Sequence, residues 1–507
     1  MALTKVTSSM IDPMVPSSTS DNLVLGPNVF SANTTGVLNY AIGKDALKSN
    51  TTGSYNLALG NKALESNIGG ASPAPGSQTG YGSNNIAIGD KALQSNTSGY
   101  ENLAIGQLNL QQNTLGKWNL AIGHRALIAN TTGVNNIAIG AYVLDKTTTA
   151  QYNLGIGFGA MEGTTSGYEN VAVGDVSLNQ NTTGYQNVAI GRNAMYTNLT
   201  GYQNVAIGRS ALGDNGTGNR NIAIGTFAMD KNQIGYSNVA IGYLALSTAT
   251  DSFENVAVGQ QALELNTSGD QNVAVGQGAL RQATSNANTA VGYGSATNVT
   301  TGSANVALGS SALSACTTGT TNTALGPSAL NTLVSYNNAT GVGYNAQVTN
   351  GDQVQLGDSA TTTYAYGAVQ NRSDQRDKAD IRDTVLGLDF IKTLRPVDFK
   401  WDFREDYFVE EEVDSGLVDE QGNPILVTRR TRVEKDGSKK RNRFHHGLIA
   451  QQVKAACDAA GVDFGGYQNH SLKGGEDVLS LGYEELIAPL IKAVQELSAK
   501  IAALEAK

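Results

Sequence analysis

A repeat of 17 residues runs through most of the chain and limits the folds that it can adopt. Each copy follows the pattern N-x-A-[IV]-G-x-x-A-L-x-x-N-T-T-G-x-x, and its strand-ending glycine recurs from Gly26 to Gly357. The interval is 17 residues almost throughout, although it is 12 residues longer between Gly60 and Gly89 and falls to 14 at the end. A period this regular predicts a solenoid of about 20 rungs.

One copy of the repeat shows how a rung would fold. Strand alternation places Val188 and Ile190 on one face, and the small Asn, Ala and Gly side chains between and beside them on the other. We expect stacking to bury the apolar face and the small face to allow close backbone approach. The stretch Arg192–Met195 is long enough for one helical turn or a second short strand. In Asn198–Gly201 the glycine would turn the chain back at positive φ.

Composition excludes several classes of function. A net charge of -9 argues against a nucleic-acid binder, which usually carries a basic patch. Cys316 and Cys457 fall in different parts of the chain, so no disulfide framework is expected. We find neither an apolar signal segment nor a run approaching the roughly 18 apolar residues of a membrane helix. No His/Cys cluster has metal-ligand spacing, and no motif predicts a cofactor.

Aromatic residues recur at one position of the repeat and leave two interpretations open. They are Tyr100, Tyr168, Tyr185, Tyr202, Tyr236 and Phe253. A ladder of rings could bind sugars, but stacking of rungs alone also aligns them. The same holds for Glu101, Glu169 and Glu254, which share another position. Glycan hydrolysis needs two carboxylates facing one sugar bond, so a glycan-cleaving spike is a lesser alternative.

The chain changes character near residue 373, where a charged and non-repetitive stretch begins. Residues 405–443 predict charged hairpin strands, either a solvated surface hairpin or an arm that grips a neighbouring chain. The segment 483–507 has a heptad seam, with Pro489 marking a kink near its start. The seam consists of Ile487, Leu490, Val494, Leu497, Ile501 and Leu504. Isoleucine and valine at a with leucine at d favour two strands, and packing within one chain is the alternative.

Motifs in this last quarter resemble the endosialidase-type intramolecular chaperone family, the self-cleaving C-terminal domains of phage tail spikes and fibres. That family's opening pattern is roughly S-D-x-R-L-K-x-x-I. It is matched by Ser373, Asp374, Arg376, Lys378 and Ile381, whereas Asp377 replaces the apolar residue. The run from His445 to Val453 is similar to H-x-G-x-I-A-Q-x-V, and the last helix also looks like the family's. The resemblance implies three chains.

The resemblance also implies a single self-cleavage between Arg372 and Ser373. The Ser373 hydroxyl would attack the Arg372 carbonyl, with Lys378 as general base. A lysine must be neutral to act as a base, so this hypothesis needs a buried site, and Asp377 would oppose it. Backbone amides or His445, a possible helper, could stabilise the oxyanion.

The N-x-A-I-G element resembles the head repeats of trimeric bacterial adhesins, which form a parallel β-roll. This resemblance implies a trimer, for which the small Asn/Ala/Gly face would suit the three-chain interface. Residues 1–16 are similar to the leader of many phage tail proteins, which implies attachment to the tail.

Together these observations predict a mainly β protein in four parts. They are an attachment or cap segment at 1–20, a parallel β-solenoid at 21–360, a linker at 361–372, and an α+β chaperone domain at 373–507 that ends in a coiled-coil helix. We expect a homotrimeric phage tail fibre, made in the host cytoplasm and located in the virion. Its partners would be other tail proteins and a host receptor, possibly a glycan, without nucleic acid or membrane insertion. A trimeric bacterial surface adhesin is the alternative.

Overall fold

The computed structural model describes residues 21–70, 80–358, 361, 363, 373–418, 424–469 and 478–506. The predicted attachment segment 1–20, most of the linker and Arg372 lie outside these described residues. The chain divides into two compact units, residues 1–347 and 348–507.

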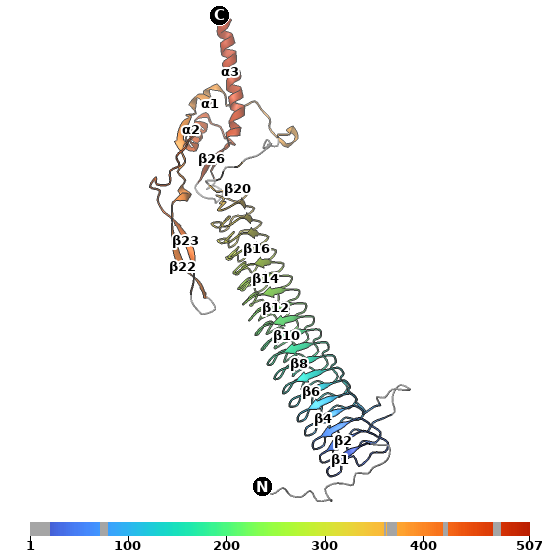
Figure 1. Ribbon diagram of the computed structural model, residues 1–507. Coiled ribbons are helices and arrows are strands. Elements are labelled where there is room, and N and C mark those ends of the chain that lie inside the picture. The colour runs from blue at the N-terminus through green and yellow to red at the C-terminus, as the bar shows by residue number, and fades with distance from the viewer. Residues whose placement is uncertain are drawn as a thin grey trace. The chain divides into compact units, whose positions relative to one another are not determined.

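Twenty short strands form one parallel sheet along the solenoid, and the rungs stack along one axis (Figure 1). Each strand has three residues and pairs in register with the strand of the next rung, as Val188 does with Val205. The strands are β1 (Leu23–Leu25), β2 (Tyr40–Ile42), β3 (Leu57–Leu59), β4 (Ile86–Ile88), β5 (Leu103–Ile105), β6 (Leu120–Ile122), β7 (Ile137–Ile139), β8 (Leu154–Ile156), β9 (Val171–Val173), β10 (Val188–Ile190), β11 (Val205–Ile207), β12 (Ile222–Ile224), β13 (Val239–Ile241), β14 (Val256–Val258), β15 (Val273–Val275), β16 (Thr289–Val291), β17 (Val306–Leu308), β18 (Thr323–Leu325), β19 (Thr340–Val342) and β20 (Val354–Leu356). The predicted parallel β-solenoid is confirmed.

The interior of each rung holds the small side chain of the strand, and this corrects the expected orientation. Ala189 is completely buried, whereas Val188 is half-buried and Ile190 is 39% exposed. The second apolar anchor also points inward, since Ala194 and Met195 are completely buried. A narrow rung has room for alanine beside leucine or methionine, so the branched side chains of the strand point outward.

The stretch after each strand is neither a helical turn nor a second strand, contrary to both sequence alternatives. It is a run of turns in which most rungs have two non-glycine residues at positive φ, such as Asn193 at 57° and Met195 at 49°. Their backbone N–H groups donate to the neighbouring rungs, as Met195 does to the Ala211 carbonyl at 3.0 Å. Rung-to-rung hydrogen bonds therefore stabilise a backbone conformation that such residues rarely adopt.

Glycine is required at two positions of the rung for different reasons. The strand-ending Gly208 has a φ of +131°, which disfavours other residues. The turn glycine Gly201 does not have the expected positive φ. A Cβ atom there would lie 2.3 Å from Asn198 Oδ1 and 2.4 Å from the Gly218 carbonyl oxygen. The turn therefore needs glycine because the next rung approaches so closely.

Two columns of asparagine run through the interior and link successive rungs. In the first, Asn187 donates its backbone N–H to Asn170 Oδ1 at 3.0 Å, and its amide Nδ2 to the same oxygen at 3.1 Å and to the Gly201 carbonyl at 2.8 Å. In the second, Asn198 Nδ2 donates to Asn181 Oδ1 at 2.9 Å. These buried amides satisfy one another, which adds directional bonds to the apolar packing.

The second unit contains short elements around a small core. Its elements are η1 (Gln375–Asp377), α1 (Leu388–Thr393), β21 (Val397–Lys400), η2 (Arg404–Asp406), β22 (Phe408–Val418), β23 (Pro424–Arg432), β24 (Phe444–Gly447), α2 (Ala450–Ala460), β25 (Tyr467–Asn469), β26 (Leu479–Leu481), η4 (Tyr483–Leu486) and α3 (Ile487–Glu505). β21 pairs with β24, β22 with β23, and β25 with β26, all antiparallel. The predicted terminal helix is confirmed.

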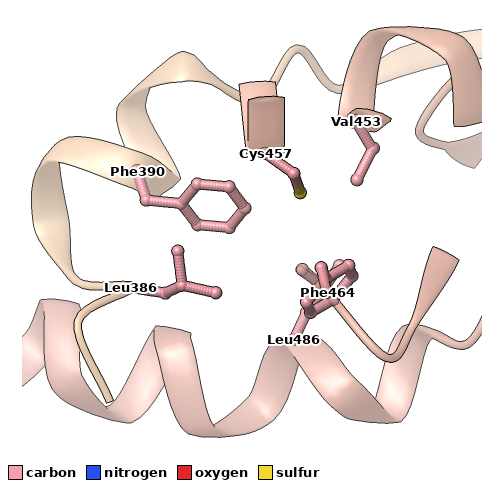
Figure 2. Close-up of a cluster of buried hydrophobic side chains, with 6 residues drawn as sticks. All are labelled: Leu386, Phe390, Val453, Cys457, Phe464 and Leu486. Carbon is pink, nitrogen blue, oxygen red and sulfur yellow. The ribbon is translucent and has the colours of Figure 1, made fainter. Parts of the chain in front are cut away.

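The core of this unit joins α1, α2 and the start of the last helix (Figure 2). Figure 2 shows its buried side chains converging, and they are Leu386, Phe390, Val453, Cys457, Phe464 and Leu486. The phenylalanine rings of Phe390 and Phe464 lie 6.3 Å apart at a tilt of 52°. Helix α3 contributes only its inner face, where Pro489 and Ala493 are buried.

Candidate functional site

Ser373 and Lys378 are brought together by a short turn. Lys378 Nζ donates a hydrogen bond to Ser373 Oγ at 2.8 Å. Between them, η1 begins at its N-cap Asp374, whose side chain accepts from the Arg376 backbone N–H at 2.9 Å. The Lys378 N–H closes the turn on the Gln375 carbonyl. The five-residue spacing thus brings the hydroxyl and the ammonium into contact through one capped turn.

An ion pair holds the same turn from outside. The Arg376 guanidinium binds Asp374 through Nε at 3.1 Å and Nη2 at 2.5 Å. The hydrogen bonds from this side chain, and then the one from the Arg376 backbone, lower the pKa of Asp374. Asp374 and Arg376, which match the family pattern beside Ser373, therefore stabilise the turn and do not contact the Ser373 hydroxyl.

The Ser373–Lys378 pair is exposed in the single chain, and so is Asp377. The self-cleavage hypothesis needs a buried lysine, and these described residues of one chain do not provide that burial. The carbonyl that Ser373 would attack belongs to Arg372, which lies outside the described residues. The hypothesis remains a prediction, with the hydroxyl and its proposed base at hydrogen-bond distance.

His445 lies in a different group of side chains. It pairs with Phe399 across β21 and β24, and its ring lies 6.1 Å from the Phe399 ring and 6.1 Å from the Trp401 ring. Among the described residues, no hydrogen bond joins it to Ser373 or Lys378. The neighbouring His446 Nδ1 lies 2.5 Å from Asp398 Oδ1. This second pair has no counterpart in the sequence predictions, and its only sequence signal is the doubled histidine.

The heptad seam of α3 faces away from the chain's own core. All six seam side chains are exposed, from 47% at Leu490, Leu497 and Ile501 to 70% at Leu504. The opposite side of the helix packs against the start of α1, where Glu496 Oε2 accepts from the Leu388 N–H at 2.9 Å. The seam is therefore open to a partner, which argues against the alternative of packing within one chain.

Rings of the aromatic ladder stack on one another. Tyr185 stacks between Tyr168 and Tyr202 at centroid distances of 4.9 and 5.0 Å, with interplanar angles of 6° and 3°. The Arg220 guanidinium lies 5.9 Å from the Tyr202 ring. Tyr236 and Phe253 stack in the same way at 5.1 Å. Sugars stack on open ring faces, so this geometry favours packing between rungs over a sugar platform.

The remaining observations add no second chemistry. Among the described residues, no group of three or more His, Cys, Asp or Glu side chains could hold a metal ion. No helix in the same ranges is long and apolar enough to cross a membrane. No protein-family model and no curated protein matches the chain.

Proposed function

We propose that the chain is a phage tail fibre protein whose C-terminal part begins the association of three copies and is then cut off at Ser373. The observation that carries the proposal is the 2.8 Å hydrogen bond between Lys378 Nζ and Ser373 Oγ. It lies in the sequence just where the repeat ends and a charged, separately packed unit begins. The 1–20 segment would attach to other tail proteins, and the solenoid would form the shaft or contact a host receptor.

The proposed reaction is an acyl shift followed by hydrolysis. Ser373 Oγ attacks the Arg372 carbonyl carbon, the C–O bond forms and the peptide C–N bond breaks. A neutral Lys378 takes the hydroxyl proton and returns it to the departing Ser373 amine. Water then hydrolyses the ester, which leaves the Arg372 carboxylate and regenerates the hydroxyl. Each chain reacts once.

Association of copies would supply the burial that the single chain does not. The pair is exposed in one chain, and burial disfavours the charged form of a lysine. A neighbouring copy that covers the turn would therefore activate Lys378. Such coupling would delay cleavage until the copies had assembled, and parallel pairing over long sequence distances folds slowly. Removal of the C-terminal part would then leave a kinetically stable fibre.

Intact masses under denaturing conditions test the cleavage. The wild-type full chain should split between Arg372 and Ser373, and Ser373→Ala should stay whole. Lys378→Met, which keeps the side-chain length without a base, should also stay whole or cleave far more slowly. Ser438→Ala, a second exposed serine of the same unit, serves as the matched control and should cleave as the wild type does.

A wild-type chain that remains intact would overturn the release step. The C-terminal unit would then be a retained cap of the fibre.

A further inference from the structure

The outward face of the solenoid sheet is mostly apolar. The first and third residues of every strand from β1 to β19 point outward, and all are Val, Ile, Leu, Tyr or Thr. Their exposed fractions reach 37% at Ile207 and Ile222 and 45% at Tyr40. The register places each of these side chains directly over its counterpart in the next rung, as Val188 lies over Val205. Two columns result that contain no charged residue and are apolar except at Thr289, Thr323 and Thr340 of the first column.

This face is too large for an ordinary surface patch. Nineteen strands at about 4.8 Å spacing and roughly 10 Å of strand length give about 900 Å². The largest apolar patch on a typical monomer is about 300–600 Å². A standard stable interface covers about 800 Å² on each partner. The area is therefore what one side of a specific protein interface needs.

The spacing of side chains on the outward face indicates which partner could cover it. A partner that covers the face must present apolar groups once per rung, about every 4.8 Å, over the same length. Another copy of this chain in parallel register has that period by construction. A glycan or small ligand needs converging polar groups, which the columns do not offer.

We propose that the outward face of β1–β19 is the contact between copies of this chain, with the Val and Ile columns packed around a common axis. This inference rests on the association of copies proposed above and specifies its surface. It replaces the Asn/Ala/Gly face, which the sequence had favoured, because Ala189 and its equivalents are buried inside each rung. The apolar columns and the exposed seam of α3 would then belong to one assembly.

Cysteine substitution in the full chain tests the surface directly. Ile241 lies in an outward column and is 37% exposed, whereas Ile234 lies in a turn and is 60% exposed. Ile241→Cys and Ile234→Cys are therefore matched in residue type and differ in face. The native Cys316 and Cys457 are buried, and burial raises the pKa of the Cys316 thiol to about 11, so they react slowly. Both variants also carry Ser373→Ala to keep the chain whole.

A short bis-maleimide should join copies through Ile241→Cys and not through Ile234→Cys. A monofunctional maleimide should label position 241 about tenfold more slowly or less, because interface cores pack as densely as protein interiors. In the opposite outcome, the two cysteine variants are labelled at equal rates and form no cross-links while the protein sediments as several chains. That result would show that copies associate through another surface than the outward face of β1–β19. Sedimentation as a single chain would overturn both the proposed contact surface and the proposed association of copies. The intact-mass experiment would still test the cleavage separately.

Discussion

The two units of the molecule bury their interiors by different means. The solenoid repeats one solution, in which alanine beside leucine or methionine fills most rungs, buried asparagines join many of them, and each rung bonds to the rung on either side. In the described part of the C-terminal unit, one core cluster contains six buried side chains, and much of the sequence of this unit is charged. Yet both leave an apolar surface open, the strand face in one and the α3 seam in the other. Each unit completes its own fold and leaves a separate apolar surface exposed.

The largest effect is expected from charges in the α3 seam. Leu497→Glu with Ile501→Glu should abolish association at micromolar concentration, because carboxylates buried in a coiled-coil seam cost several kcal/mol. Both residues are 47% exposed in the single chain, so the helix itself should survive. Sedimentation and circular dichroism measure the two effects. Ala499→Glu with Ala502→Glu, two exposed alanines of α3 outside the seam, should associate normally. Equal behaviour of the two double variants would refute the seam.

Core truncation should separate the two units. Phe390→Ala and Leu212→Ala each remove a buried side chain, at a cost of about 2–5 kcal/mol. Phe390 belongs to the only core of its unit among the described residues, so the C-terminal unit should become sensitive to protease. Leu212 has equivalent rungs on both sides, so Leu212→Ala should lower the melting temperature without loss of the rod. If the C-terminal unit of Phe390→Ala stays resistant to protease, the expected difference in tolerance between the two units is wrong.

Repair of a gap in the asparagine column should stabilise the solenoid. Asn232 Oδ1 is buried without a hydrogen-bond partner, because the next rung carries Ala249 where rungs such as those of Asn198 and Asn215 are followed by another asparagine. Ala249→Asn should donate to that oxygen and raise stability by about 1 kcal/mol, the scale of one buried hydrogen bond. The melting temperature of the assembled protein measures it. A lower value would show that the rung has no room for the larger side chain.

The smallest effect concerns a carboxylate of the rod. Burial, opposed by Lys231, raises the pKa of Asp230 in the folded state. The ionised form is therefore disfavoured by folding, and its cost appears as the pH rises through the folded-state pKa. Asp230→Asn should be slightly more stable than the wild type at neutral pH and equal to it in acid. Lys231 keeps Asp214 at 2.8 Å in the variant. A difference in stability between Asp230→Asn and the wild type that grows as the pH falls would contradict this prediction.

The sequence predicted the elements of the rod and missed their orientation. The glycine period located the strands, and alternation gave two faces, but alternation alone does not say which face points inward. Comparison of the repeat copies would have shown which face points inward. The middle strand residue is alanine or glycine from β2 to β19, while its neighbours vary among larger residues. A confined position tolerates only a small side chain. The helical or strand interpretation of 192–195 failed because left-handed residues held by neighbouring rungs have no local sequence signature.

The candidate site was only partly accessible from sequence. The spacing of Ser373 and Lys378 predicted their encounter, because five residues fit one capped turn. Their exposure could not be foreseen, since it depends on what covers the turn. The helper role of His445 came from resemblance alone, and in the structure this ring contacts Phe399 and Trp401.

Both proposals require several copies of the chain to cover the open apolar faces of the two units. Sedimentation equilibrium of the full-length Ser373→Ala chain tests this requirement most directly, because this variant retains both faces on one polypeptide. We expect a particle of three times the 52.8 kDa chain mass that persists on dilution to micromolar concentration. A particle of 52.8 kDa at every concentration would contradict it.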